Sequence, residues 1–260
     1  MATSTPTSDP ATADIRFADV QMAFGERTVL DGLDCRFPAG KISVILGGSG
    51  TGKSTLLRLI GGLIAPQGGR IDVADENVGG ASGARLRSIR ENVAMLFQGG
   101  ALLDSLTVRD NIALPLREHT KLTPAAINAR VTEALQSVGL GELHKLLPGE
   151  LSGGMLRRAA LARAIVYRPR ILLCDEPFSG LDPVSVHRIE RLLIQLNREH
   201  GITILVVSHH IRSTLRMADH VMLLLAGRSI EGSPEEMLQS TESDVAEFFA
   251  EAAPQTEEVP

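Results

Sequence analysis

The sequence Gly47-Gly48-Ser49-Gly50-Thr51-Gly52-Lys53-Ser54-Thr55 decides the fold of this chain. An apolar run at 41–46 precedes it and an amphipathic pattern at 53–60 follows, which predicts a strand, a tight loop and a helix. Glycines let a backbone approach phosphate with several N–H groups directed at it, and the helix N-terminus adds partial positive charge. We therefore expect a phosphate-binding loop in which Lys53 reaches the β- and γ-phosphates and the Ser54 hydroxyl holds Mg²⁺. The alternative is a glycine-rich turn that merely joins strand to helix.

The overall composition is that of a globular protein. Of 260 residues, 43% are hydrophobic and 22% charged, a balance that allows a sizeable core. The formal net charge of -5 and the absence of Trp argue against a nucleic-acid partner, which needs positive charge or stacking surfaces. Cys35 and Cys174 lie in apolar stretches, so we expect buried, reduced thiols.

Short apolar runs alternate with helical patterns along most of the chain. This order predicts an α/β domain with a largely parallel, buried sheet. Residues 15–37 differ, because two β-rich stretches joined at Gly25, Glu26 and Arg27 show polar alternation and predict a separate antiparallel sheet. The expected strands of the main sheet are 41–46, 93–97, 171–174, 203–207 and 221–225, and the expected helices include 53–60, 124–138, 153–166 and 184–197.

The two ends of the chain carry no pattern of a packed element. Residues 1–13 lack the basic start and apolar run of a signal peptide and are expected to form a loose tail. The polar end at 253–260 is expected to be disordered after a short helix at 244–250. No apolar stretch approaches the roughly 20 residues that a membrane helix needs, so the chain is not expected to cross a bilayer itself.

A second motif is the acidic pair Asp175-Glu176, which directly follows the apolar strand 171–174. The carboxyl ends of parallel strands are where α/β sheets keep their ligand crevice. Asp175 is expected to complete the Mg²⁺ shell, and Glu176 to orient or deprotonate a water facing the γ-phosphate. The alternative is an acidic strand end that is simply solvated.

A third motif is Leu151-Ser152-Gly153-Gly154-Met155, which opens a helix rich in arginine. Ser152 can cap this helix while the two glycines expose its first N–H groups, which predicts a second anion site. Taken alone, the motif would favour an ordinary capped helix.

Together with Gln98, with Ser179 to Asp182 and with Ser208-His209, these motifs resemble the ABC-transporter ATPases over residues 15–232. The resemblance implies a RecA-like P-loop NTPase core with an antiparallel β subdomain and an inserted helical subdomain at about 99–167. It implies an ATPase domain at 14–232 and a C-terminal extension at 233–260.

The same resemblance implies how the site works. Two subunits close head to tail, and each ATP lies between the phosphate loop of one subunit and Ser152 to Gly154 of the other. Glu176, His209 and Lys53 are then catalytic, with His209 contacting the γ-phosphate, while Asp182 signals between the paired sites. Residues expected to bind Mg²⁺ are Ser54, Gln98 and Asp175. Residues expected to bind the nucleotide are Phe24, Gly47, Gly48, Ser49, Gly50, Thr51, Gly52, Lys53, Ser54, Thr55, Gln98, Ser152, Gly153, Gly154 and Asp182.

Three residues depart from the family pattern. Met155 replaces a glutamine, Phe24 stands where tyrosine is usual, and His210 stands where aspartate is usual. The first two remove no phosphate ligand, so they are expected to alter rate or affinity at most. We assign no role to His210 from the sequence.

Residues 96–102, 115–120 and 151–165 resemble more closely the ATPases of the Mla system, the MCE-type phospholipid transporters of Gram-negative envelopes. This resemblance implies a membrane permease, a STAS-domain protein and an MCE-domain lipid-binding protein as partners, at the cytoplasmic face of the inner membrane. The apolar residues Leu102, Leu103 and Leu106 either contact the permease or pack within the helical subdomain.

Other functions remain open at the level of sequence. The transporter's cargo could be another lipid, an amino acid or a metal ion, because other chains handle it. A chromosomal ATPase of this family would carry a long coiled coil, and no sustained heptads occur between Lys53 and Ser152. A scaffold that binds ATP without turnover would not need Glu176 and His209.

Overall fold

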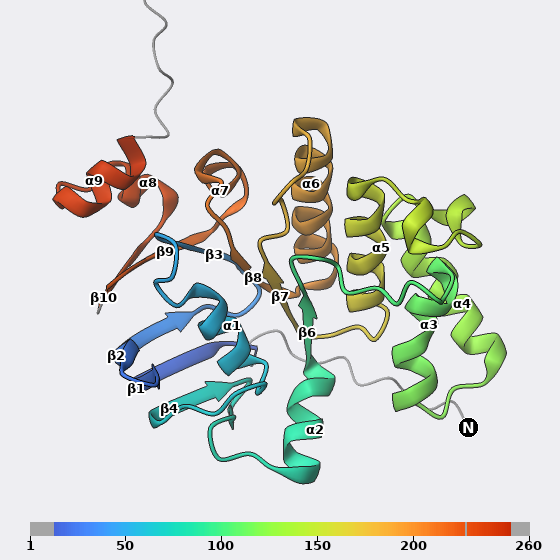
Figure 1. Cartoon of the computed structure of the whole chain (residues 1–260), viewed down its shortest axis with the longest axis horizontal. Coiled ribbons are helices and arrows are strands. Elements are labelled where there is room, and N and C mark those ends of the chain that lie inside the picture. Colours follow the sequence, from blue (N-terminus) through green and yellow to red (C-terminus); the bar gives the residue numbers. More distant parts are fainter. Residues whose placement is uncertain (1–12, 227, 251–260) are drawn as a thin grey trace, which may run out of the picture.

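The computed structural model describes residues 13–226 and 228–250 (Figure 1). Most of the predicted N-terminal tail, and the end predicted to be disordered, therefore lie outside the described residues. Ala13 is the exception within that tail. It is buried, and its carbonyl accepts a hydrogen bond of 3.0 Å from Oγ1 of Thr203, which ties the start of the described chain to the main sheet.

The main sheet has six strands in the order β10-β9-β3-β8-β7-β6. All neighbouring pairs are parallel except β10 with β9. Every residue of β3 and β8 is buried, which is why these strands are apolar in the sequence except for Ser43 and Thr203. The prediction of a buried parallel sheet is confirmed, although the antiparallel edge strand β10 was not predicted. The strands are β3 (Ile42–Leu46), β6 (Val93–Leu96), β7 (Ile171–Asp175), β8 (Thr203–Val207), β9 (His220–Leu225) and β10 (Arg228–Gly232).

A second, antiparallel sheet has the order β2-β1-β4-β5, as the alternation at 15–37 predicts. It is made of β1 (Ile15–Phe24), β2 (Arg27–Phe37), β4 (Gly68–Val73) and β5 (Glu76–Asn77). Gly25 has φ 60°, a left-handed conformation that lets the chain reverse between β1 and β2. Phe24 and Arg27 pair across this turn, so both sit at the same end of the hairpin.

Helices fill the long connection between β6 and β7 and lie together at one end of the molecule (Figure 1). They are α3 (Val108–His119), α4 (Pro124–Ser137), two short 3-10 turns (Gly141–Leu143 and Pro148–Glu150) and α5 (Gly153–Ile165). Side-chain caps fix where the helices begin: Thr107 caps α3, Thr123 caps α4 and Ser152 caps α5. The start of α5 is thus set locally by Ser152.

The remaining helices flank the sheets or follow them. Asp182 caps α6, and Gly201 ends it with φ 64°, so this helix is longer than the predicted 184–197. None of the described helices is long and apolar enough to span a membrane. These helices are α1 (Lys53–Ile60), α2 (Gly83–Asn92), α6 (Pro183–His200), α7 (Ile211–Met217), α8 (Pro234–Leu238) and α9 (Ser243–Ala250).

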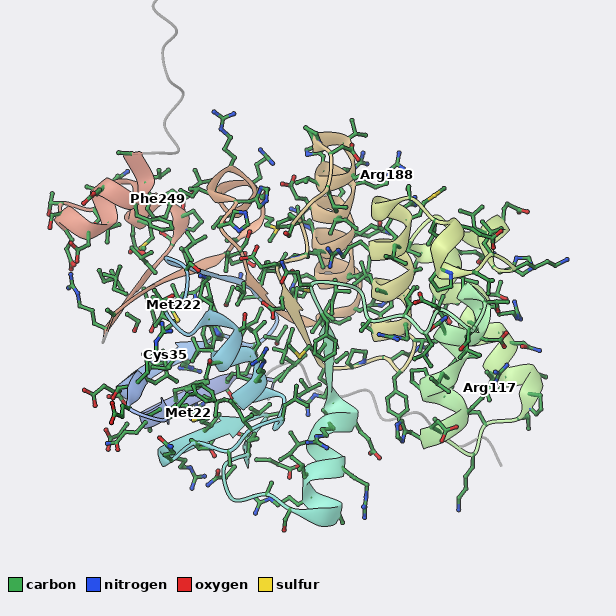
Figure 2. The ribbon with its side chains drawn as sticks, in the orientation of Figure 1. Met22, Cys35, Arg117, Arg188, Met222 and Phe249 are labelled. Atoms are coloured by element: carbon green, nitrogen blue, oxygen red, sulfur yellow. The ribbon has the colours of Figure 1, made fainter. Side chains whose placement is uncertain are left out.

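The core lies on both faces of the main sheet. One cluster joins the sheet to α5 and α6, and the other joins it to α1 and the antiparallel sheet. Figure 2 shows Met22, Cys35 and Met222 in the second cluster, between the two sheets. Cys35 and Cys174 are buried and unpaired, as predicted, and burial raises the pKa of both thiols. The main sheet is therefore a covered middle layer whose carboxyl edge remains available for a site.

Candidate functional site

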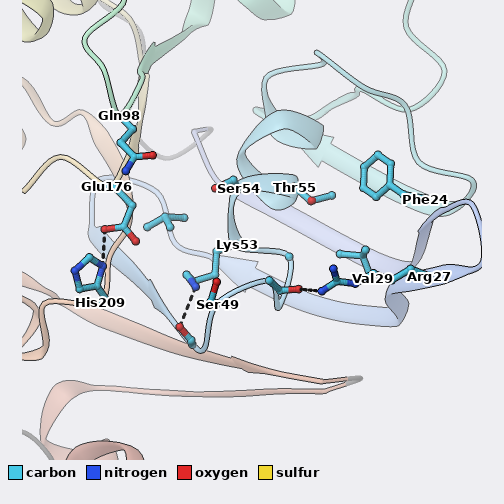
Figure 3. A pocket seen from close by; sticks show the side chains of 14 residues that line it. Phe24, Arg27, Val29, Ser49, Lys53, Ser54, Thr55, Gln98, Glu176 and His209 are labelled. Carbon is cyan, nitrogen blue, oxygen red and sulfur yellow. Dashed lines mark hydrogen bonds and ion pairs between the residues drawn. The ribbon is translucent and has the colours of Figure 1, made fainter. Parts of the chain in front are cut away.

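A cavity of about 600 Å³ opens at the carboxyl edge of the main sheet, beside the first turn of α1 (Figure 3). It joins residues from both sheets, from α1 and from the segments that follow β6, β7 and β8. Most of the residues predicted to bind nucleotide line it. The lining consists of Phe24, Arg27, Val29, Gly47, Ser49, Gly50, Gly52, Lys53, Ser54, Thr55, Gln98, Glu176, Val207 and His209.

The loop between β3 and α1 requires glycine at several positions. Gly47 has φ 147° and Gly52 has φ 107°, values that other residues rarely adopt. A Cβ at Gly47 would lie 2.3 Å from the carbonyl oxygen of Leu224, and one at Gly52 would lie 2.7 Å from Cγ1 of Val29. The glycines thus let the loop lie directly against its neighbours, and the loop forms a main-chain cradle that ends at the N-terminus of α1.

The ammonium group of Lys53 lies across this cradle. Its Nζ donates hydrogen bonds of 2.9 Å to the carbonyl of Gly47 and 2.7 Å to that of Gly48. Burial lowers the pKa of Lys53, while the charges of Glu176 and Asp175 oppose that shift. A cation held here by flexible methylenes can exchange carbonyl partners for phosphate oxygens.

Two oxygen groups meet beside the cavity, where Ser54, which lines it, contacts Asp175, which is not one of the lining residues. The hydroxyl of Ser54 donates a hydrogen bond of 3.0 Å to Oδ1 of Asp175, the last residue of β7. Hydroxyl and carboxylate oxygens next to a phosphate cradle are the ligands that Mg²⁺ prefers in proteins. The residues present therefore fit a magnesium ion bound with a nucleotide.

Glu176 and His209 form a pair at the next position along the edge. Oε2 of Glu176 lies 2.9 Å from Nδ1 of His209, as the dashed line in Figure 3 marks. Glu176 has φ 48°, and its N–H donates to the carbonyl of Val207 at 3.0 Å. A non-glycine residue in this left-handed region is strained, and such strain clusters at functional sites. The carboxylate can accept a proton from a water in the cavity while the imidazole fixes its orientation.

Gln98 and Asp182 occupy different positions relative to the cavity. Gln98 lines it, and its Nε2 donates a hydrogen bond of 3.4 Å to Oγ of Ser179. Asp182 does not line it. Its carboxylate accepts hydrogen bonds of 3.0 Å from the N–H groups of Val184 and Ser185. The hydrogen bond with the Ser185 side chain, followed by these backbone bonds, lowers the pKa of the exposed Asp182.

The structure does not bring Ser152, Gly153 and Gly154 to this cavity. Ser152 and Gly153 are exposed at the start of α5, and Oγ of Ser152 accepts a hydrogen bond of 3.3 Å from the N–H of Met155. A Cβ at Gly154 would lie 2.5 Å from Oγ of Ser185, so α5 packs closely against the start of α6. Within the described residues, the second predicted anion site is thus separate from the first.

Two further residues of the phosphate loop, Gly48 and Thr51, shape it without lining the cavity. Oγ1 of Thr51 donates a hydrogen bond of 3.0 Å to the carbonyl of Gly48, which closes the turn. Their predicted contact with the nucleotide stays a prediction.

The sequence did not single out Arg27, Val29 or Val207 as lining residues. Nη2 of Arg27 donates a hydrogen bond of 2.7 Å to the carbonyl of Gly50, so β2 holds the phosphate loop from outside. Phe24, at the other side of the same turn, is 49% exposed and offers its ring to the cavity. No local signal marks Arg27 or Val29, because the contact joins one sheet to a loop of the other.

A phosphate cradle, a Ser–Asp oxygen pair and a Glu–His pair at the edge of a parallel sheet define a P-loop nucleoside triphosphatase. Residues 30–179 match the ABC transporter family model, and the chain belongs to this family, whose cassettes are ATPases. Both conclusions agree with the predicted fold class, an α/β P-loop core with an antiparallel β sheet and inserted helices.

Relatives match along most of the chain. The intermembrane phospholipid transport system ATP-binding protein MlaF of Escherichia coli strain K12 is 44% identical over 232 residues, 89% of this chain and 86% of that protein. The probable ribonucleotide transport ATP-binding protein mkl of Mycobacterium leprae is 40% identical over 240 residues, 92% of this chain and 69% of that protein. The dimeric structure of the bacterial ABC transporter cassette MJ0796 has a TM-score of 0.77 at 30% identity and covers 85% of this chain and 98% of its own. That cassette is also known in a post-hydrolysis state bound to ADP and Pi.

Proposed function

We propose that this ATPase drives a membrane permease that moves phospholipid between the inner and outer membranes. The 44% identity to MlaF, a phospholipid transport ATP-binding protein by name, supports this cargo. The relative named for ribonucleotide transport is less similar, at 40% identity. By the same reasoning the chain works at the cytoplasmic face of the inner membrane, with a STAS-domain protein and an MCE-domain lipid-binding protein as further partners.

The observation that carries the mechanism is that the site is split. Lys53, Ser54, Glu176 and His209 share one cavity, while Ser152 with its exposed helix start faces elsewhere. In a head-to-tail homodimer each Ser152 would face the phosphate loop of the partner subunit, and two ATP molecules would be enclosed. The known dimer of the similar cassette MJ0796 supports this arrangement.

Within such a dimer each residue has a defined task. The loop amides and Lys53 bind the phosphates, and Phe24 stacks against the adenine. Ser54, Asp175 and Gln98 would hold Mg²⁺, which supplies charge neutralisation on the phosphate oxygens when bound. Glu176 orients a water and takes its proton, and His209 keeps the Glu176 carboxylate in place. Phosphoryl transfer needs mainly such positioning and electrostatic stabilisation.

We place the permease contact next to Gln98. Leu103 is 47% exposed and Phe97 is 39% exposed, whereas Leu102 packs against the core. The proposed contact therefore includes fewer residues than the apolar segment that the sequence suggested for it. A displacement of Gln98 during hydrolysis would reach Leu103, because only a short loop separates the two residues.

The dimer can be tested through the cap of α5. Ser152→Asp keeps a good N-cap but places a negative charge where the partner's triphosphate would lie. In the Glu176→Gln background with Mg-ATP, we expect light scattering to give a dimer, and Ser152→Asp to return it to monomer. Thr123→Asp makes the same change at the cap of α4 and should leave the dimer intact. A dimer that survives Ser152→Asp would contradict the proposal.

The cargo is tested by purifying the chain from membranes with whatever stays attached. Co-purified phospholipid with an MCE-domain and a STAS-domain protein is the expected result. A sugar-binding or amino-acid-binding protein in their place would assign another cargo.

A further inference from the structure

Arg157, on the inner side of α5, is a buried charge that the proposed mechanism does not use. The residue is 8% exposed. None of the ion pairs in the described part of the chain includes it, and burial lowers the pKa of its guanidinium. A buried cation without a carboxylate is costly unless hydrogen bonds compensate it. The groups that accept hydrogen bonds from Arg157 therefore indicate the role of its side chain.

Those partners are backbone carbonyls of two separate segments. Nη1 donates to the carbonyl of Phe97 at 3.1 Å and also to that of Gln98. Nη2 donates to the carbonyl of Ser179 at 3.3 Å. One segment follows β6 and carries the Gln98 side chain into the cavity. The other leads from Glu176 to Asp182.

A second bond joins the same two segments. Nε2 of Gln98 donates to Oγ of Ser179 at 3.4 Å, so backbone and side chain of Gln98 are both tied to the loop that follows Glu176. Arg157 lies roughly one and a half turns beyond Ser152, in the helix whose start is the second predicted anion site. A single guanidinium thus reaches from that helix to both sides of the catalytic cavity.

Two other arginines of α5 provide an internal comparison. Arg163 donates to the carbonyl of Ala101 at 2.7 Å and to that of Gly100 at 3.0 Å, but not to Ser179. Arg158 donates to the carbonyl of Val138 at 2.8 Å, at the end of α4. All three are partly or fully buried donors to carbonyls, and Arg157 alone among them connects to the segment that carries Glu176.

We propose that Arg157 is a positioning residue that makes α5, the Gln98 segment and the 176–182 loop move as one unit. A partner nucleotide that binds at Ser152 would then shift Gln98 and Glu176 of the same chain together. This inference rests on the proposed roles of Gln98 and Ser152. Arg157 does not line the cavity, so its loss should spare nucleotide binding and reduce the rate of turnover.

The test compares Arg157→Met with Arg163→Met, which removes a similar number of carbonyl bonds from the same helix. We expect the KM for ATP of both variants to stay within about twofold of wild type. For Arg157→Met, kcat should fall about tenfold or more, because small misplacement of catalytic groups has large effects on rate. For Arg163→Met, kcat should fall less than about threefold, even when the two methionine variants lose similar thermal stability. Arg157→Lys, which keeps charge and some donors, should recover part of kcat.

Hydrogen exchange gives a readout that does not depend on turnover. In the wild type, Mg-ATP should slow amide exchange in 97–101 and in 176–182 to a similar extent. In Arg157→Met, Mg-ATP should slow exchange in one of the two segments more than in the other. Equal loss of kcat in both methionine variants, following their melting temperatures, would overturn the proposal. So would joint protection in Arg157→Met. If Arg157→Met does not fold, Arg157→Lys is compared with Arg163→Lys by the same criteria. A wild type with no Mg-dependent hydrolysis would instead contradict the proposed function, and the exchange experiment would still decide the role of Arg157.

Discussion

The hydroxyl of Ser54 lies 3.0 Å from Oδ1 of Asp175, although 121 positions separate the two residues in the chain. Ser54 belongs to the helix after β3 and Asp175 ends β7, and β8 lies between these two strands. The contact is therefore made above an intervening strand, at the edge where all three strands end. Each residue needs the other in place to form an oxygen site.

Asp175→Asn should weaken the dependence of hydrolysis on magnesium. An amide supplies one neutral oxygen in place of the anionic carboxylate, so a hard cation loses its main attraction. We expect ATPase activity to fall about 100-fold at a magnesium concentration of about 1 mM and to recover partly at higher concentrations. A magnesium titration of phosphate release checks this, with the exposed Asp31→Asn as control. Unchanged magnesium dependence in Asp175→Asn would remove this residue from the site.

Lys53→Ala should weaken nucleotide binding itself. The Nζ group lies 2.9 Å from the carbonyl of Gly47, and charge-assisted hydrogen bonds to phosphate contribute about 1.5–3 kcal/mol each. We expect Kd for ATP to rise about tenfold to 100-fold in calorimetry. Lys41→Ala, at an exposed lysine paired with Asp219, should leave Kd unchanged. Wild-type affinity in Lys53→Ala would contradict the assignment.

Glu176→Gln should separate binding from turnover. The amide keeps the size of the side chain but cannot accept a proton, so we expect ATP affinity near wild type and kcat at least about 100-fold lower. Phosphate release measured at saturating ATP gives kcat, and Glu235→Gln at an exposed position is the matched control. Equal residual ATPase in wild type and Glu176→Gln would exclude Glu176 as the base.

Gly52→Ala should destabilise the protein as well as the site. The backbone has φ 107° at this position, and the added Cβ would lie 2.7 Å from Cγ1 of Val29. Strain of this kind costs about 1–3 kcal/mol. Urea unfolding should show a loss in that range, while Gly80→Ala, where a Cβ meets nothing within 4 Å, should stay within about 0.5 kcal/mol. Equal stability of the two variants would contradict the steric account.

Glu190 predicts how stability depends on pH. This carboxylate of α6 is buried, and Nη2 of Arg216 lies 2.5 Å from its Oε1. Burial raises the pKa of Glu190, but hydrogen bonds from Arg216 and Ser213 outweigh that effect and hold the pKa below its usual value. Because the folded pKa is depressed, the stabilisation is complete above the ordinary glutamate pKa of about 4.3 and is lost as pH falls through the folded value.

Glu190→Gln should therefore lose about 2 kcal/mol of unfolding free energy at pH 7, and its deficit relative to wild type should shrink below about pH 4. Urea unfolding across this pH range is the measurement. Glu133→Gln removes an exposed ion pair with Arg168 and should cost less than about 1 kcal/mol. A deficit that grows toward low pH would refute the sign of the pKa shift.

The elements that could be located from the sequence are those with a clear apolar pattern, which is continuous in buried strands, alternating in β1 and β2, and periodic in amphipathic helices. Residues 203–207 are predicted and observed as the same strand, since a strand covered on both faces is mostly apolar, and its one polar residue, Thr203, is paired with the carbonyl of Ala13. Strand β10 escaped prediction because it is an edge strand with exposed Arg228 and Glu231. Helix α2 was not predicted either, because Ile89 is its one buried residue and the helix therefore has no apolar stripe.

The residues of the site likewise divide into those that the sequence could assign and those that it could not. Motifs that are continuous in sequence, such as the phosphate loop and Asp175-Glu176, could be assigned individually, and the rule that parallel strands end at one edge brings them together. Arg27 supports the loop from another sheet, and no spacing in the chain encodes that contact. The predicted roles of Asp182 and of Ser152 to Gly154 depend on a second subunit and remain predictions.

The close approach of Gly47 to the carbonyl oxygen of Leu224 has a consequence for how this protein tolerates change. The contact joins main chain to main chain, so substitutions of the leucine side chain leave it in place. Only a shift of the whole strand β9 can relieve it. Substitutions at position 224 should therefore leave the start of the phosphate loop in place. An insertion or deletion in strand β9 would move the Leu224 carbonyl and, with it, the loop at Gly47.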